Sequence, residues 1–390
     1  MVEISLDEDH DGIANLVDNC KRIFNPEQLD SNSDGKGDAC QNPDRYTGQW
    51  KQLVVLYHSD ESVPPPDVNE GDVLKWMQEL SDYHSEISNG EFWSSGAFQP
   101  NEPADVLGWI PRSANMAEEI AKYVSPLEYD NVIYISSEPF IAATGMMRSE
   151  LYWPGFGYAF RSQIEIPSNY LQSYLATGDS TIIKRTLIHE FGHTIGLGHS
   201  GFLSCGEGQV DRLLSPDVPA CQYIAYGSGC DVMGSGSGYP NLVQLERMGW
   251  VQDLDAPRSD LTLFGYYQTV TSDGIYSINP LRGFDEVGYE RLKGIKIPRG
   301  DGSSFYIEYR RRAGFDAYIS DEMNLEGALI MLEKPKSVHR NGNLIDPIEG
   351  TRRSNPVLQL DETFTDWVSG ASITVQAVQD DRLELKVEFD

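Results

Sequence analysis

Two periodicities of apolar residues divide much of the chain into predicted helices and strands. Between residues 73 and 87 apolar side chains recur at steps of three and four, which is one face of an α-helix. His84 lies on this face, so we expect it to pack in a core rather than bind a ligand. A second helix is predicted over Ser113–Val124. Apolar runs at Gln52–Tyr57 and Asn131–Ser136 are typical of buried strands, and strands that alternate with helices predict an α/β layer.

Further strands and helices are predicted in the middle of the chain. The segment 145–167 is rich in aromatic residues and glycine and ends in a strand-like run at Gln163–Ile166. A helix is predicted to begin near Asp179 or Ser180, and its broad apolar surface should anchor it in the core. Residues 241–249 predict a short helix with one apolar face.

The pattern changes after Pro257, where short alternating or apolar runs are separated by turns. Strong turn signals occur at Gly300–Gly302 and at Asn341–Asn343. Short strands at such spacing predict an all-β, sandwich-like domain over residues 256–390. The runs are TLFGYY, GIYSI, GIKI, SFYIEY, ALIML, SITVQAV and LELKVEF.

The first 46 residues contain too few apolar positions to form a core. Oxygen-bearing side chains alternate there at the spacing of two EF-hand-like loops, with Gly12 and Gly35 at the sixth position, where the chain turns sharply. Calcium prefers such oxygen ligands, so we expect Ca²⁺ and a Cys20–Cys40 disulfide bond to order the segment. The predicted calcium ligands are Asp7, Asp9, Asp11, Asn15 and Asp18 in the first loop, and Asp30, Asn32, Asp34 and Asp38 in the second.

These loops and cysteines resemble a thrombospondin type 3 repeat over nearly all of the first 40 residues. The resemblance implies a calcium-binding spacer, adhesion module or brace. The alternative is an acidic, disordered tail, because the composition is also rich in turn residues.

The net charge of the chain limits the classes of partner that it can bind. The 390 residues include 60 acidic and 30 basic side chains, which give a net charge of −30. This sign argues against nucleic acid or an anionic membrane surface as a partner. No apolar run reaches transmembrane length, so we expect no membrane insertion. The oligomeric state stays open.

The five cysteines fall into two groups, and neither has the paired spacing of a cysteine zinc site. Disulfide bonds in an oxidising compartment are the better interpretation, so we expect a secreted, extracellular protein. Cys205, Cys221 and Cys230 allow three pairings, and the odd count leaves one thiol free or bonded outside the chain.

The stretch TLIHEFGHTIGLGHS holds three of the seven histidines. A step of four residues returns to the same helical face, so His189 and His193 can offer two nitrogens to one metal ion. Gly196 tolerates a left-handed turn that would end the helix and bring His199 to the same ion. Three nitrogens leave a fourth position for water, as in a catalytic zinc site. Glu190 lies at the edge of this face, where it can take a proton from that water.

This stretch resembles the zinc signature of the metzincin proteases, His-Glu-x-x-His-x-x-Gly-x-x-His. The family has a methionine turn beneath the metal, and Met233 is the matching residue. The run Asp231-Val232-Met233-Gly234 is most similar to the gametolysin-like branch. In the family the next segment, here Gly234–Gly238, forms a wall of the specificity pocket, and its glycines predict flexibility.

The resemblance implies three domains. A calcium-binding repeat is expected at residues 1–46, an α/β metzincin domain at 47–255 and the β-rich domain at 256–390. In metzincins an edge strand pairs with the extended substrate, and we expect the segment 145–167 to supply it.

The activity implied is that of a secreted zinc endopeptidase. Water bound to Zn²⁺ and activated by Glu190 would hydrolyse peptide bonds of an extracellular protein or glycoprotein. Some relatives add a tyrosine as an oxyanion donor just after the methionine turn. Tyr239 is the candidate here, although it lies six residues past Met233, which is farther than in those relatives.

Two other functions are alternatives. One is a calcium-dependent adhesion or matrix-binding protein whose protease fold is inactive, against which the presence of Glu190 argues. The other is a zinc hydrolase that acts on a non-peptide amide or ester. Cleavage of a generic unfolded protein separates the first function from these two.

Overall fold

The computed structural model divides into two compact units, Met1–Leu197 and Gly198–Asp390, and each is described by itself. The structure describes residues 13–14, 17–19, 26–29, 48–58, 67–113, 116–125, 128–137, 144–153, 157–166, 168–205, 221–255, 265–281, 292–334, 340–347, 356–379 and 381–390.

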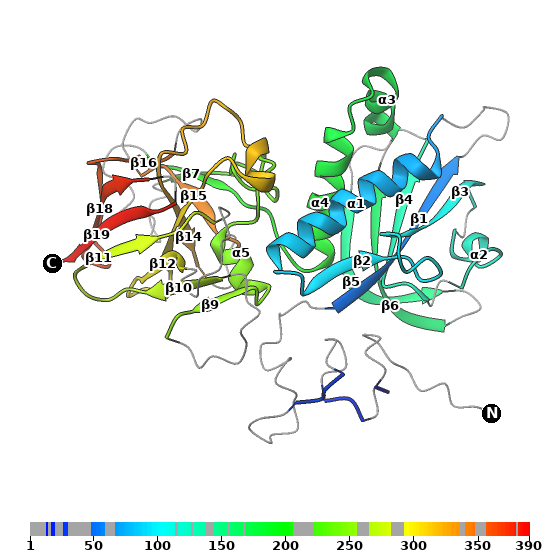
Figure 1. Cartoon of the computed structure of the whole chain (residues 1–390), viewed down its shortest axis with the longest axis horizontal. Coiled ribbons are helices and arrows are strands. Elements are labelled where there is room, and N and C mark those ends of the chain that lie inside the picture. Colours follow the sequence, from blue (N-terminus) through cyan, green and yellow to red (C-terminus); the bar gives the residue numbers. More distant parts are fainter. Residues whose placement is uncertain are drawn as a thin grey trace. The chain divides into compact units, whose positions relative to one another are not determined.

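A six-stranded sheet lies at the centre of the first unit (Figure 1). Its order is β2-β1-β4-β6-β5, and β3 also pairs with β1. Every pair is parallel except β5 with β6, so an antiparallel strand forms one edge. The strands are β1 (Gly48–His58), β2 (Phe92–Ser95), β3 (Asp105–Pro111), β4 (Asn131–Ser136), β5 (Thr144–Trp153) and β6 (Gly157–Ile166).

These strands confirm the apolar runs predicted at Gln52–Tyr57 and Asn131–Ser136, and every residue of β4 is buried. The segment 145–167 supplies an edge strand as expected. The edge is β5, because the predicted run Gln163–Ile166 lies in β6, inside the sheet.

Helix α1 (Glu70–Ile87) crosses one face of this sheet (Figure 1). A capping box starts it, in which the Asn69 side chain accepts the N–H of Asp72 and the Asp72 carboxylate accepts the N–H of Asn69. The predicted apolar face is confirmed, since all its members are buried: Val73, Trp76, Met77, Leu80, His84 and Ile87.

The helix predicted over Ser113–Val124 is too long, because the structure has only α2 (Met116–Ile120). After this single turn the N–H groups of Lys122 and Tyr123 bond three residues back instead of four, which tightens the chain and ends the helix. Ile120 is buried and belongs to an apolar cluster with residues of β1, β3 and β4.

Two further helices complete the first unit, α3 (Ser168–Thr177) and α4 (Thr181–Thr194). Helix α4 begins where predicted, with Ser180 at the N-cap position and the Asp179 carboxylate accepting the N–H of Thr181 at 2.9 Å. Its Lys184 forms an ion pair with Glu79 of α1.

The second unit contains a nine-stranded sheet and a four-stranded sheet. The larger has the order β8-β7-β15-β14-β13-β12-β10-β9, with β16 paired to β14, and the smaller has the order β11-β19-β18-β17. The strands are β7 (Phe202–Cys205), β8 (Cys221–Ile224), β9 (Val251–Asp253), β10 (Gly265–Thr269), β11 (Gly274–Ile278), β12 (Leu292–Pro298), β13 (Ser304–Tyr309), β14 (Gly327–Glu333), β15 (Asn343–Ile345), β16 (Leu358–Gln359), β17 (Thr363–Asp366), β18 (Ala371–Val378) and β19 (Leu383–Phe389).

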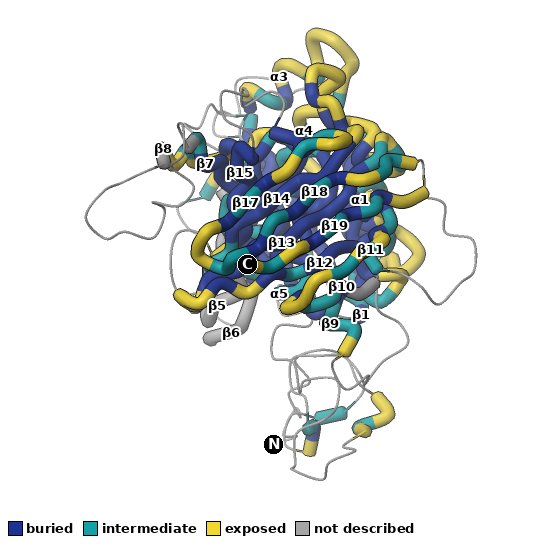
Figure 2. Tube along the Cα trace, turned by 90° about the vertical axis from the view of Figure 1, so that its left-hand side faces the viewer, coloured by how far each residue is buried: buried dark blue, intermediate teal, exposed yellow. Residues whose placement is uncertain are grey.

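One apolar core joins these two sheets. Ile295, Phe305 and Ile330 of the larger sheet cluster with Ile373 and Leu385 of the smaller. Figure 2 shows β13 and β14 buried along most of their length, whereas in β18 and β19 buried positions alternate with more exposed ones. The two sheets agree with the β-rich region predicted after Pro257, although β7, β8 and β9 of the larger sheet precede that region.

Two short helical segments lie in the same unit. Helix α5 (Leu242–Arg247) has the predicted N-terminus, where the Asn241 side chain accepts the N–H of Gln244 at 3.1 Å. A 3₁₀ helix, η4 (Gly314–Tyr318), follows β13.

Candidate metal centre

Helix α4 determines the direction of two histidines and ends as the sequence predicts. Gly196 has a φ of 92°, a left-handed conformation that a glycine adopts without strain. The N–H of Gly196 bonds the carbonyl of His193 at 3.0 Å, and the N–H of Leu197 bonds the carbonyl of Gly192 at 2.9 Å. This Schellman motif turns the chain back immediately after the helix.

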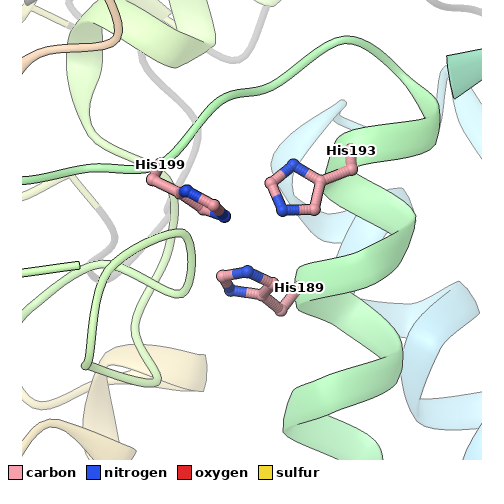
Figure 3. A group of neighbouring side chains, drawn as sticks. All are labelled: His189, His193 and His199. Carbon is pink, nitrogen blue, oxygen red and sulfur yellow. The ribbon is translucent and has the colours of Figure 1, made fainter. Parts of the chain in front are cut away.

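The three imidazoles of His189, His193 and His199 gather around one point (Figure 3). One nitrogen from each ring lies within 4.8 Å of the other two. Inward shifts of less than about 1 Å bring such a set to the Zn–N distance of about 2.0–2.1 Å. All three rings are partly exposed. Three neutral nitrogens with solvent access are the donor set of a catalytic zinc site, so the residues fit this ion.

A hydrogen bond orients one of these rings. The Nδ1 atom of His193 lies 2.8 Å from the carbonyl oxygen of Leu197, so Nδ1 carries the proton and Nε2 offers its lone pair. Burial lowers the pKa of His193, and this favours the neutral ring that a metal requires.

Glu190 follows His189 in α4 and is buried. Burial raises the pKa of its carboxyl group to about 7, and a hydrogen bond from the Gly145 N–H opposes that shift. Gly145 belongs to the edge strand β5 and lies close to the helix. A β-carbon at this position would lie 2.2 Å from the carbonyl oxygen of Glu190. Only glycine therefore allows β5 to approach the backbone that carries the carboxylate.

Aromatic packing anchors the segment of α4 that carries Glu190. The ring of Phe191 has its centroid 5.6 Å from that of Trp50, 5.9 Å from that of Phe92 and 4.5 Å from that of His84. Burial lowers the pKa of His84 to about 4, so this imidazole is neutral. Its Nδ1 lies 2.8 Å from the Leu80 carbonyl oxygen. The prediction that His84 is a core residue is confirmed.

The predicted methionine turn lies in the second unit, and Met233 is fully buried. The carbonyl of Met233 accepts the N–H of Ser200 at 2.9 Å, which ties the turn to the residue after His199. The Asp231 carboxylate accepts the N–H of Met233 at 2.7 Å and the Asn241 side-chain amide at 2.7 Å. The turn is thus built around a buried acidic side chain.

The glycines after Met233 allow close backbone packing. A β-carbon at Gly234 would lie 2.2 Å from the Ser228 carbonyl oxygen, and one at Gly236 would lie 2.3 Å from that of Gly229. The N–H of Ser235 also bonds Ser228 at 2.7 Å. Flexibility was the predicted reason for these glycines, whereas the structure indicates close approach of two chain segments.

Tyr239 is also fully buried. Its hydroxyl accepts the N–H of Phe315 at 3.0 Å, and its own N–H bonds the Asp316 carboxylate at 2.9 Å. These bonds give Tyr239 a structural role in the second unit. Its role as an oxyanion donor stays a prediction.

A buried charged residue that the sequence does not single out is Arg310, directly after β13. Its guanidinium is fully buried, 2.8 Å from the Glu308 carboxylate and 2.9 Å from that of Asp316. It also donates to the carbonyls of Cys230, Tyr239 and Pro240. Arg310 therefore holds both ends of the methionine turn. The only sequence signal is a charged run after an apolar strand, Arg310–Arg312, which is not specific.

The structure reduces the possible disulfide pairings among the three cysteines after His199. Cys230 is a buried free thiol, so the two predicted pairings that include it are absent. Cys205 and Cys221 are opposite each other in the antiparallel register of β7 and β8.

Of the predicted calcium ligands, Asp18 lies in the part of the chain that the structure describes. It is buried, and its Oδ1 accepts the Gln28 side-chain amide at 3.0 Å. Gln28 also accepts the N–H of Asn19 at 2.9 Å. The remaining predicted ligands and the Cys20–Cys40 pair lie outside the described residues. The ligands are Asp7, Asp9, Asp11, Asn15, Asp30, Asn32, Asp34 and Asp38.

Comparison with known proteins identifies one segment. The family model of the thrombospondin type 3 repeat matches residues 5–28 and 29–45. Such repeats bind calcium and occur in extracellular proteins, which agrees with the predicted Ca²⁺ loops. No curated protein matches the chain. Among the described residues, none of the helices has the length and apolar character needed to span a bilayer.

Proposed function

We propose that this chain is a secreted zinc endopeptidase of the metzincin type, most similar to the gametolysin-like branch. The observation that carries the proposal is the convergence of three imidazoles within 4.8 Å, with a buried carboxylate next to the first of them in the chain. A structural zinc site would use four protein ligands, and among the described residues the cluster holds three. Three ligands would leave a position on the ion for water, and hydrolysis requires such a position together with a carboxylate that acts as the base.

Each residue has a separate role in the proposed reaction. His189, His193 and His199 would hold Zn²⁺, which supplies Lewis-acid activation of water and of the substrate carbonyl. Glu190 would accept a proton from the attacking water and return it to the leaving amine. The Gly145 N–H would keep the Glu190 carboxylate in position, since it donates a hydrogen bond to it.

The first unit offers a surface for the substrate backbone. The sheet ends in β5, which is antiparallel to β6 and close to Glu190 through Gly145. An extended peptide could pair with this edge, because an edge strand presents unpaired N–H and C=O groups. Such binding depends little on side chains. The proposed substrate is therefore an extended segment of an extracellular protein or glycoprotein.

The N-terminal repeat supports an extracellular location and a requirement for calcium. The same repeat also favours the second candidate function, a calcium-dependent adhesion protein without activity. Zinc binding needs only the histidines, whereas hydrolysis also needs a base, so the presence of Glu190 favours the enzyme.

The test is hydrolysis of casein by the full chain, loaded with Zn²⁺ and Ca²⁺, with zinc content measured in parallel. We expect cleavage that 1,10-phenanthroline abolishes. Glu190→Gln should retain zinc and lose about 10²- to 10⁴-fold in rate, the usual contribution of a general base. The control is Asp82→Asn, an exposed carboxylate on α1, which should cleave like the wild type.

Each alternative predicts a different result. Stoichiometric zinc without cleavage of casein or of a peptide library would support the adhesion protein. Hydrolysis of small N-acyl amides without cleavage of any peptide bond would support the non-peptide hydrolase. A wild-type chain that binds no zinc would contradict both zinc hydrolases and leave the calcium-dependent adhesion protein.

A further inference from the structure

His199 differs from the other two histidines in how its ring is supported. His189 and His193 lie on α4, whose backbone hydrogen bonds fix their direction. His199 follows the Schellman turn and belongs to no helix or strand. A ligand on irregular backbone needs other contacts to hold its ring, because small errors in orientation weaken metal binding.

The ring of Tyr226 supplies such a contact. Its centroid lies 3.7 Å from that of the His199 ring, with 37° between the ring planes. The two aromatic rings are therefore in close, tilted contact. The Tyr226 side chain is 44% exposed, so burial in a core does not explain its position.

The backbone of Tyr226 has an unusual conformation for a large residue. Its φ is 56°, in the left-handed region that favours glycine. Tyr226 is the third residue of a turn closed by the N–H of Gly227 and the carbonyl of Ile224 at 3.1 Å, a position where glycine is preferred. Strain of this kind persists where surrounding contacts impose it, and it is common at functional sites.

Contacts on the next two residues hold the turn beside His199. A β-carbon on Gly227 would lie 2.4 Å from Cβ of Phe202 and 2.7 Å from its backbone nitrogen. The N–H of Ser228 bonds the Ser200 carbonyl at 3.3 Å. The chain therefore places the Tyr226 ring against the imidazole from a turn that is attached to the same segment.

We propose that Tyr226 is a positioning residue, whose ring fixes the orientation of His199 for metal binding. The inference rests on the proposed zinc site but adds a residue that the zinc signature does not contain. It also explains the strained turn, because a glycine in place of Tyr226 would relieve the backbone and lose the ring contact.

The test measures affinity for Zn²⁺ alone, by competition with a chromogenic chelator, in the full chain. Tyr226→Gly should lower the affinity about 10-fold, the low end of the effect of removing a residue that orients a metal ligand. Tyr226→Phe keeps the ring and should remain within about twofold of the wild type. Tyr318→Ala removes an exposed aromatic side chain elsewhere in the second unit and should have no effect.

Two further measurements separate positioning from a structural role. Urea unfolding of the metal-free chain should show Tyr226→Gly to be as stable as the wild type or more stable, because glycine accepts the positive φ. The Co²⁺-substituted Tyr226→Gly chain should have altered d–d absorption bands, which report ligand geometry.

The outcomes distinguish this inference from the proposed function. Unchanged zinc affinity and Co²⁺ bands in Tyr226→Gly would overturn the inference and leave the protease intact. The same loss of affinity in Tyr226→Phe would also overturn it, since the ring would not be the cause. A wild-type chain without zinc affinity would instead overturn the proposed function.

Discussion

Helix α4 in the first unit and the predicted methionine turn around Met233 in the second are fixed by different kinds of interaction. Phe191 of α4 packs among the aromatic side chains of Trp50, Phe92 and His84. The methionine turn surrounds a buried carboxylate, Asp231, and is bonded to a buried guanidinium. One segment thus depends on apolar burial and the other on satisfied buried charge.

The difference has a physical basis in backbone structure. A helix satisfies its own N–H and C=O groups, so its side chains are free to be apolar. An irregular turn that is buried must find partners for its backbone groups elsewhere. Arg310 and the carboxylates around the turn provide such partners. Mutations should therefore destabilise the two segments by different amounts and with different pH dependence.

The largest effect is expected from Arg310→Met in the second unit. Removing the guanidinium leaves Glu308 and Asp316 buried without their cation, which should cost about 3–5 kcal/mol in the free energy of unfolding. Urea denaturation measures this loss. The control is Arg382→Met, which removes an exposed ion pair with Glu384 and should cost at most about 1 kcal/mol. A loss below 1 kcal/mol for Arg310→Met would mean that the turn does not depend on this charge.

The next effect is a pH dependence that originates from His84. Its pKa is about 4 in the folded chain and 6.5 in the unfolded chain, so the unfolded state binds more protons between these values. The neutral His84 ring therefore makes its full contribution to the free energy of unfolding above pH 6.5. This contribution is lost as the pH falls through 4, and the total loss is about 3 kcal/mol.

Comparison of the wild type with His84→Gln isolates this dependence, because glutamine does not titrate. Urea unfolding from pH 7.5 to pH 4 should show the difference between the two chains decreasing as pH falls. A difference that stays constant over this range would contradict a buried, neutral imidazole.

A smaller effect is expected where β5 meets α4. Gly145→Ala places a methyl group 2.2 Å from the Glu190 carbonyl oxygen, so strand or helix must move. We expect a loss of about 1–3 kcal/mol in stability, together with lower caseinolytic activity and retained zinc. Gly108→Ala in β3 is the matched control, because a β-carbon there meets no atom within 4 Å. Equal caseinolytic activity in the two variants would contradict the prediction that packing of β5 against Glu190 affects activity.

The smallest effect is expected from Phe191→Leu. The substitution keeps an apolar side chain but removes the aromatic contacts, with a cost of about 1–2 kcal/mol, less than the 3–5 kcal/mol typical of Phe→Ala. This loss should not vary with ionic strength, whereas that of an exposed ion pair would. Leu175→Ala, on the exposed side of α3, is the control and should change stability by less than about 0.5 kcal/mol. A salt-dependent loss in Phe191→Leu would contradict an apolar anchor.

Local patterns predicted the elements of the candidate site well. The helical period identified the buried face of α1, including His84, and the glycine after the histidine pair identified the end of α4. Both features depend on neighbours within one or two turns of chain. The helix predicted over Ser113–Val124 was too long, because its end is set by a change in hydrogen bonding that the apolar period does not report.

Contacts between distant residues could not be predicted in this way. Arg310 bonds the carbonyl of Cys230, 80 residues earlier, and Gly145 donates to Glu190 across 45 residues. The domain expected from the sequence at residues 47–255 includes residues 198–255. In the structure these residues belong to the second unit, where β7 pairs with β15. Pairing partners of a strand leave no mark in its own sequence.

The sequence by itself determined which histidines form the candidate metal cluster and where the helix that carries two of them ends, because histidine spacing and a glycine cap act over a few residues. The tertiary structure decided what surrounds them: Gly145 against Glu190, Tyr226 against His199 and Arg310 around the methionine turn. The reason is that burial, close backbone approach and ring contact arise only when segments distant in the sequence meet, and their residue types are common in many other settings.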